Sequence, residues 1–252
     1  MPAQFDLSKL SVRQFAERFR EEMIPLSNTF SYFCASVPMS EEDLKEYLQE
    51  PVAALPPAIA SALPKISIFL VPYLERGNER KAKASGGDFI SIEKPPEGRL
   101  TSFTHIRLGE ESVLAFALKD QEVAEYHYRF YHLLATLMGE HWTDSMETVY
   151  ARLLHEELNA DVHGEVDEPS WRMKQALRRS KSVRGGKGFR DYARQSFIDT
   201  LTLYLHGICC DIDVDTGPRQ LPSRYLRRRL LALEELFPPP AGYAVFPEQL
   251  EP

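Results

Sequence analysis

The stretch Ile66-Ser-Ile-Phe-Leu-Val-Pro-Tyr-Leu74 is the apolar run of the chain that most resembles a membrane segment. It is far shorter than the roughly 20 residues that a spanning helix needs, so we do not expect it to cross a bilayer. Its β-branched and aromatic residues instead favour a buried strand over Ile66–Val71. Alternating segments at Asp88–Glu93 and Ser102–Leu108 predict two further strands, and Ser112–Leu118 predicts either a fourth strand or the start of the next helix.

Segments with helical spacing of apolar residues precede and follow these strands in the sequence. Residues 11–24 and 41–49 have helical periodicity, and Ser11 and Ser40 occupy candidate N-cap positions. Four prolines interrupt residues 51–65, which we expect to form a broken connector. From about residue 115 the apolar period changes to 3.6 and predicts helices near 118–139, 144–165, 169–181, 189–210 and 222–236.

This order of elements predicts an α+β fold in which a small β-sheet in the first half is packed with a predominantly helical C-terminal half. The simplest organisation is a single domain over residues 1–252. We divide it into N-terminal helices and the Pro-rich connector (1–65), the small sheet (66–118), the helical portion (119–236) and an extended tail (237–252).

The composition excludes several classes of protein. The chain has 252 residues and a formal net charge of −7, which argues against a general affinity for nucleic acid or for an anionic membrane. Only three cysteines are present, and the N-terminus shows neither a basic nor an apolar region of a secretory signal. We therefore expect a cytoplasmic protein without a disulfide framework.

Six of the seven histidines lie between residues 127 and 206, in or beside the predicted helices. On a helical wheel His127 falls inside the apolar arc of its helix. Such a histidine is either a core residue that is hydrogen-bonded to a tyrosine or a carbonyl group, or a metal ligand.

The next helix carries two acids, Glu157 and Asp161, that the wheel places one turn apart between Tyr150 and Leu154. Like charges at this spacing destabilise a helix unless a positive group lies between them. A metal ion is one candidate, and an arginine of the basic segment described below is the other.

A third helix aligns Asp199 and His206 on a mixed polar and apolar stripe. These residues either form a core network or, with the acids and histidines of the other helices, hold a metal. The candidate ligands of a divalent zinc, manganese or iron ion are His127, His155, Glu157, Asp161, Asp199 and His206. Glu156 is the candidate catalytic base, because a metal-bound water needs a proton acceptor for hydrolysis.

The motifs around these residues do not assign a family. His155-Glu-Glu-Leu-Asn159 resembles the metallopeptidase pattern His-Glu-x-x-His, but its last position is asparagine. Leu153-Leu-His-Glu156 resembles the Leu-His-Asp motif of helical phosphohydrolases, but Glu156 stands where that motif has aspartate.

The segment Trp171–Arg194 contains nine basic residues and one acid. Its glycine-containing centre runs into a predicted helix N-terminus, where backbone amides and the helix dipole favour anions. The candidate anion-binding residues are Arg178, Arg179, Arg184 and Lys187. The other interpretations are a solvated loop and an internal partner for the buried acids.

These patterns lead to two hypotheses. The first is a metal-dependent hydrolase of a small or phosphorylated substrate, with the metal site between helices and the basic segment as substrate anchor. The second is a non-catalytic interaction or regulatory protein, in which the histidines are structural and the basic segment docks an acidic protein partner. Neither hypothesis needs a membrane, and the overall acidity argues against nucleic acid.

Overall fold

The computed structural model describes residues 10–77, 87–180, 186–210 and 219–246, and its chain divides into two compact units. Unit 1 comprises Met1–Val52 and Leu63–Arg129, and unit 2 comprises Ala53–Ala62 and Phe130–Pro252. The α+β class predicted from the sequence is confirmed, with a mixed sheet in the first half and helices in the C-terminal half. The single-domain organisation stays a prediction.

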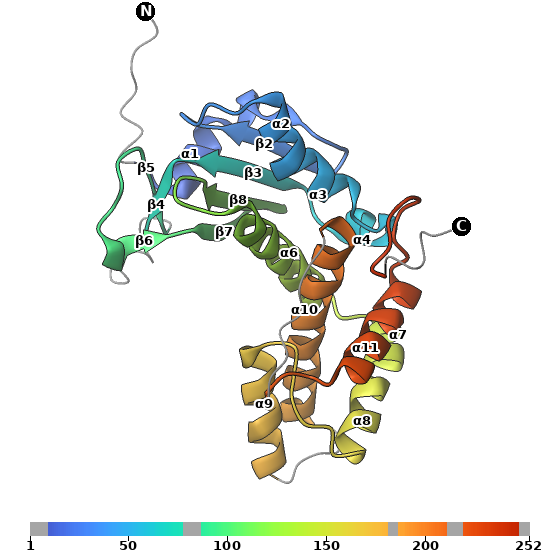
Figure 1. The fold of residues 1–252 in the computed structure, drawn as a ribbon. Helices are drawn as coiled ribbons and strands as arrows, with labels where there is room; N and C mark the ends of the chain where they lie inside the picture. Colours follow the sequence, from blue (N-terminus) through green and yellow to red (C-terminus); the bar gives the residue numbers. More distant parts are fainter. Residues whose placement is uncertain (1–9, 78–86, 181–185, 211–218, 247–252) are drawn as a thin grey trace, which may run out of the picture. The chain divides into compact units, whose positions relative to one another are not determined.

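Unit 1 contains a five-stranded mixed sheet with the strand order β1-β2-β3-β8-β7 (Figure 1). Its strands are β1 (Ile24–Pro25), β2 (Phe30–Cys34), β3 (Ile66–Val71), β7 (Phe103–Leu108) and β8 (Glu111–Ala117). Strand β3 pairs in parallel with both β2 and β8, while β1 and β7 form antiparallel edges. The prediction of a strand at Ser112–Leu118 is therefore right, and its helical alternative is wrong.

A second, three-stranded antiparallel sheet has the order β5-β4-β6. It consists of β4 (Tyr73–Glu75), β5 (Phe89–Ser91) and β6 (Leu100–Thr101), and the 3₁₀ turn Glu97–Arg99 precedes β6. The strands β1, β2, β4 and β6 were not predicted from the sequence, and β1, β4 and β6 have only two or three residues each, which is too few to show a period.

Helix α1 (Val12–Arg18) covers one face of the larger sheet. Its N-cap Ser11 forms the predicted cap: the Ser11 hydroxyl accepts from Gln14 N at 3.3 Å, and Gln14 Oε1 accepts from Ser11 N at 3.1 Å. The rings of Phe15 and Phe69 meet edge to face at 5.2 Å. On the opposite face of β8, Phe116 contacts Tyr126 at a ring distance of 4.9 Å. Both faces of β3 and β8 are thus buried, which explains their continuous apolar sequence.

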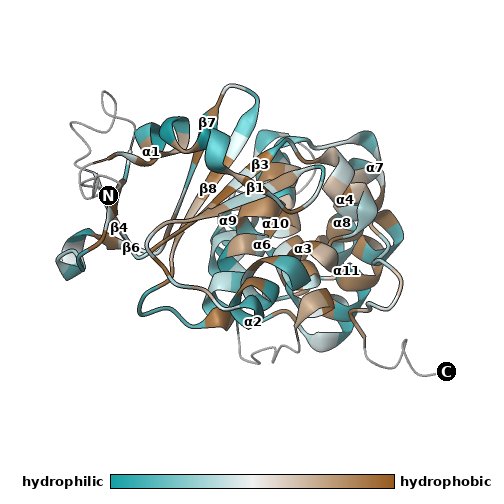
Figure 2. Ribbon diagram, turned by 90° about the horizontal axis from the view of Figure 1, so that it is seen from above, coloured by the Kyte–Doolittle hydropathy of each residue, from teal (hydrophilic) through white to brown (hydrophobic). Residues whose placement is uncertain are grey.

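The connection from β2 to β3 is helical. It contains α2 (Glu41–Leu44), a π-helical turn (Lys45–Gln49), α3 (Glu50–Ala53) and α4 (Pro57–Ala62). The predicted cap at Ser40 is present, and the prolines of the connector shorten its helices as expected. In Figure 2 the central strands β3 and β8 are brown, whereas the ribbon of α2 is largely teal.

Unit 2 is built from helices. They are α7 (Asp144–Met146), the π-helical turn Glu147–Ala151, α8 (Arg152–Asn159), α9 (Glu168–Arg179), α10 (Lys187–Cys209) and α11 (Ser223–Leu236), together with α4 and most of α6 (Val123–Glu140). Gly139 of α6 lies so close to α10 that a Cβ atom there would be 2.8 Å from Ile198 Cγ1, so this crossing requires glycine. No helix within the described ranges has both the length and the apolar composition needed to cross a bilayer.

Substitution of a buried aromatic residue tests the packing of the unit 1 core. We expect Phe69→Ala to lower the free energy of unfolding by about 3–5 kcal/mol, because the ring is buried against Phe15 and Phe33 and leaves a cavity. Urea denaturation followed by circular dichroism measures the change. The control Ile92→Ala alters an exposed side chain and should cost less than about 1 kcal/mol. Equal costs for the two variants would contradict this packing.

Candidate functional site

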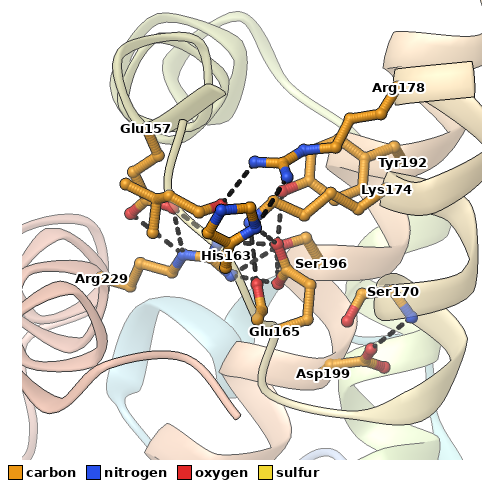
Figure 3. A network of polar contacts seen from close by, with 12 residues as sticks. Glu157, His163, Glu165, Ser170, Lys174, Arg178, Tyr192, Ser196, Asp199 and Arg229 are labelled. Atoms are coloured by element: carbon orange, nitrogen blue, oxygen red, sulfur yellow. Dashed lines mark hydrogen bonds and ion pairs between the residues drawn. The ribbon is translucent and has the colours of Figure 1, made fainter. Parts of the chain in front are cut away.

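A cluster of buried charges lies at the centre of unit 2 (Figure 3). Four of its members are charged residues, Glu157, Glu165, Lys174 and Arg229, and each is at most 1% exposed. Tyr192 and Ser196 of α10 complete the cluster with hydroxyl groups. We call these six residues the buried ion cluster. Its charges come from α8, α9, α11 and the segment between α8 and α9, so it joins elements that are distant in the sequence.

Arg229 is the centre of the buried ion cluster. Its Nη2 lies 2.7 Å from Glu157 Oε2, and its Nη1 lies 2.6 Å from Glu165 Oε2. The same Nη1 donates to the Ser196 hydroxyl at 2.8 Å. One planar guanidinium group therefore satisfies two carboxylates in different directions, which a lysine ammonium would do less well.

Glu165 has two more partners. Lys174 Nζ lies 2.9 Å from Glu165 Oε1, and the Tyr192 hydroxyl donates to the same oxygen at 2.5 Å. Lys174 Nζ also donates to the carbonyl oxygen of Gly164 at 2.8 Å. Two acids thus balance two bases, and the polar groups of the cluster are hydrogen-bonded, as a buried ion network requires.

The backbone holds Glu165 in place beside the segment that precedes α11. Glu165 N donates to Arg219 O, and Leu221 N donates to Glu165 O, both at 3.0 Å. Gly164 has φ +81°, and a Cβ atom there would lie 2.1 Å from the carbonyl oxygen of Gln220. Glycine is therefore required for this close approach.

The ion pairs control the protonation of the cluster. Burial raises the pKa of Glu165, but Arg229 and Lys174 together with the Tyr192 hydrogen bond outweigh burial and hold that pKa at about 2. Burial lowers the pKa of Lys174, which its contact with Glu165 partly offsets. Burial also raises the pKa of Tyr192, so its hydroxyl stays a donor to Glu165.

The two acids singled out on the helix predicted near 144–165 differ completely in environment. Glu157 is buried, and an arginine is its positive partner, although this arginine belongs to α11 and not to the basic segment. The expectation that Asp161 also faces inward is wrong, because its side chain is 77% exposed and is paired with Arg178 at 3.0 Å. Helix α8 ends at Asn159 and Asp161 has φ 53°, so a helical wheel does not apply to it.

Asp199 is buried and accepts hydrogen bonds from neighbouring groups of the protein. It accepts hydrogen bonds from the Ser170 backbone N–H at 3.1 Å and from the Gln195 side chain at 2.7 Å. Burial raises its pKa. Asp199 therefore fixes the first turn of α9 to α10. His206 is also buried, with its ring 6.0 Å from that of Tyr131.

His127 lies on the part of α6 that belongs to unit 1. Its Nε2 lies 2.9 Å from the carbonyl oxygen of Glu46. Burial lowers the pKa of His127, so the ring is neutral and carries its proton on the nitrogen that faces this carbonyl. This hydrogen bond to a carbonyl group is the contact that the core-histidine interpretation expects, and the metal-ligand interpretation stays a prediction.

His155 and Glu156 lie on the outer side of α8. The His155 ring stacks on that of Phe189 at 3.7 Å. Glu156 forms an ion pair with Arg228 and lines a shallow cavity of about 240 Å³ between α8 and α11. A general base must be free to accept a proton, so this ion pair competes with the predicted catalytic role.

The candidate anion-binding residues have different environments in the structure. Arg178 turns back onto its own unit, donating to Val162 O and His163 Nδ1, both at 2.9 Å. Arg179 and Lys187 are exposed, and Arg184 lies outside the described residues. Helix α10 begins at Lys187 after Gly186, without a side-chain cap.

The sequence analysis missed Glu165, Lys174 and Arg229 as a group. A signal for Arg229 exists, since it lies three residues after Leu226 and four before Leu233, in the apolar stripe of α11. Its neighbours Arg227 and Arg228 lie on the polar face of α11 and are exposed. A run of three arginines therefore reads as one exposed basic segment, although Arg229 is buried.

Removal of the central cation tests the buried ion cluster. We expect Arg229→Met to lower the free energy of unfolding by about 3–5 kcal/mol, because it leaves Glu157 without its buried partner. The neighbouring control Arg228→Met removes an exposed ion pair and should cost less than about 1 kcal/mol. Chemical denaturation of both variants measures the difference. Similar stabilities would show that the cluster is not buried as described.

The depressed pKa of Glu165 predicts acid sensitivity. Its stabilising contribution is fully present above its ordinary pKa of 4.5 and is lost as the pH falls through about 2. We expect a loss on the order of 3 kcal/mol from this group between pH 6 and pH 2. Urea denaturation across this range should show a weaker pH dependence in Glu165→Gln. Carbon-13 NMR titration of the Glu165 carboxyl group in the unaltered protein gives a second measurement, and a midpoint near 4.5 would contradict the assignment.

Comparison of the chain with models of protein families, with curated proteins and with solved structures gives no match.

Proposed function

We propose that this protein is a non-catalytic interaction or regulatory protein whose helical unit presents a basic surface to an acidic protein partner. One observation carries the proposal: the buried carboxylates of Glu157 and Glu165 are neutralised by Arg229 and Lys174. This arrangement supplies the positive charge that the acids need without a metal ion. The cluster then has the role of holding four segments of unit 2 together.

The metal-dependent hydrolase of the sequence analysis stays an untested hypothesis. For a metal to use Glu157, this carboxylate would have to leave Arg229, which would then keep Glu165 as its carboxylate partner, and breaking one ion pair of a buried network is costly. Asp199 would likewise have to give up its hydrogen bond to the first turn of α9. These costs favour the interaction hypothesis.

The basic surface consists of Arg179 at the end of α9 and Lys187, Arg190 and Arg194 on the first turns of α10. The last three follow one face of the helix at intervals of three and four residues. All four side chains are exposed, and none has an acidic partner among the residues that the structure describes. Unpaired cations on one face attract an acidic partner at long range, although the chain as a whole is acidic.

A fluorescein-labelled deca-glutamate peptide is a suitable probe of this surface. We expect the full chain to bind it with an affinity that falls as salt is raised, because exposed charges are screened. The double variant Arg190→Glu/Arg194→Glu should weaken binding roughly tenfold or more, as reversed charges repel the probe. Fluorescence anisotropy measures the affinity.

The matched control Arg76→Glu/Lys119→Glu changes the total charge equally but alters exposed residues of unit 1. Equal losses in both double variants, or no loss in either, would contradict the proposed surface. Metal analysis of the purified chain provides the second criterion. Stoichiometric zinc, manganese or iron that disappears in Glu157→Gln would overturn the proposal and favour the hydrolase.

A further inference from the structure

Unit 1 contains a cavity that the proposed function does not use. Its volume is about 880 Å³, within the range of small-molecule sites. It lies where β3 and β8 begin, and α1, the residues before β3 and the turn between β7 and β8 supply its lining. The lining residues that matter here are the cations Arg13, Arg20 and Lys65 and the acids Glu17, Glu110 and Glu111.

Glu111 is held rigidly at this cavity. The Ser67 hydroxyl donates to Glu111 Oε1 from the buried side, and Ser67 itself is only 3% exposed. The Ser31 hydroxyl lies 3.4 Å from that of Ser67, which extends the polar chain into the sheet. From the other side Arg20 Nη2 approaches Glu111 Oε2 at 3.1 Å. The Glu111 side chain remains 18% exposed, so this oriented carboxylate has capacity for a further donor.

The backbone of the turn brings the acids to the cavity. Gly109 has φ +65° as the first central residue of the two-residue turn between β7 and β8, a position that favours glycine. The turn places Glu110 and Glu111 next to each other in the lining. Opposite charge comes from Arg13 of α1, which donates to the carbonyl oxygen of Arg107 at 3.2 Å and is thereby anchored to β7.

The signs of these charges restrict the ligand. Arg20 and Glu111 pair with each other, whereas Lys65, Glu17 and Glu110 have no ion-pair partner within the described part of the chain. A simple anion that approached Lys65 would also meet the acids, and a simple cation at Glu111 would also meet the bases. A ligand that carries both charges satisfies both sets.

We propose that this cavity binds a small zwitterion, a free α-amino acid or a dipeptide, with its ammonium group at Glu111 and its carboxylate at Lys65. The remaining apolar lining, Pro64 and Leu108, contacts the side chain of the ligand. This inference goes beyond the proposed function, since it concerns only unit 1 and would make the chain responsive to a metabolite.

Isothermal titration calorimetry of the full chain tests the proposal with the twenty free amino acids and diglycine as probes. We expect at least one of them to bind, and its N-acetylated and C-amidated forms to bind roughly tenfold more weakly, because each lacks one charge. An absence of binding by every probe at millimolar concentration would overturn the proposal. Equal binding of a blocked form would also overturn it, since a zwitterion would then not be required.

Two substitutions locate the site. Lys65→Met and Glu111→Gln should each weaken binding of the free amino acid roughly tenfold, and Glu111→Gln keeps an acceptor for Ser67. The matched controls Lys119→Met and Glu122→Gln alter exposed charges of unit 1 outside the cavity and should bind normally. Equal affinity of all four variants would overturn the assignment to this cavity. Circular dichroism confirms folding of each variant, and loss of this binding would leave the deca-glutamate result unaffected.

Discussion

The helices of unit 2 depend on one guanidinium group that faces two buried carboxylates. Arg229 contacts Glu157 and Glu165, and Lys174 balances the remaining charge. Buried charges are costly unless each has a partner and its hydrogen bonds are satisfied. The contribution of the cluster is therefore specificity: a shift of α11 along its axis would move Arg229 away from both acids, which would leave Glu157 without its cation and Glu165 with Lys174. Apolar contacts alone would tolerate such a shift more easily.

The polar residues that first suggested a metal site also have partners within the protein. Glu157 is committed to Arg229, Asp199 to Ser170 and Gln195, and His127 to the Glu46 carbonyl. Each of these side chains has a hydrogen-bond or ion-pair partner, as buried polar groups usually do. The surface of α10 and the cavity of unit 1 instead carry charged side chains that have no ion-pair partner among the described residues. For this reason both proposals concern binding.

The two units differ in the way they bury polar groups. In unit 1 the sheet satisfies its backbone through strand pairing, and the polar chain from Ser31 through Ser67 to Glu111 runs outward to a cavity. In unit 2 the polar cluster is closed, since its charged residues are at most 1% exposed. A closed network stabilises, whereas an open one leaves groups available to a ligand.

The sequence by itself determined the α+β class, the strands at Ile66–Val71, Asp88–Glu93 and Ser102–Leu108 and the caps at Ser11 and Ser40. Apolar period and capping depend on residues close in the chain, so a single sequence records them. It also indicated that Glu157 needs a positive partner. Only the tertiary structure identified that partner as Arg229, 72 residues away. Which helices meet depends on packing between distant segments, and no local period contains that information.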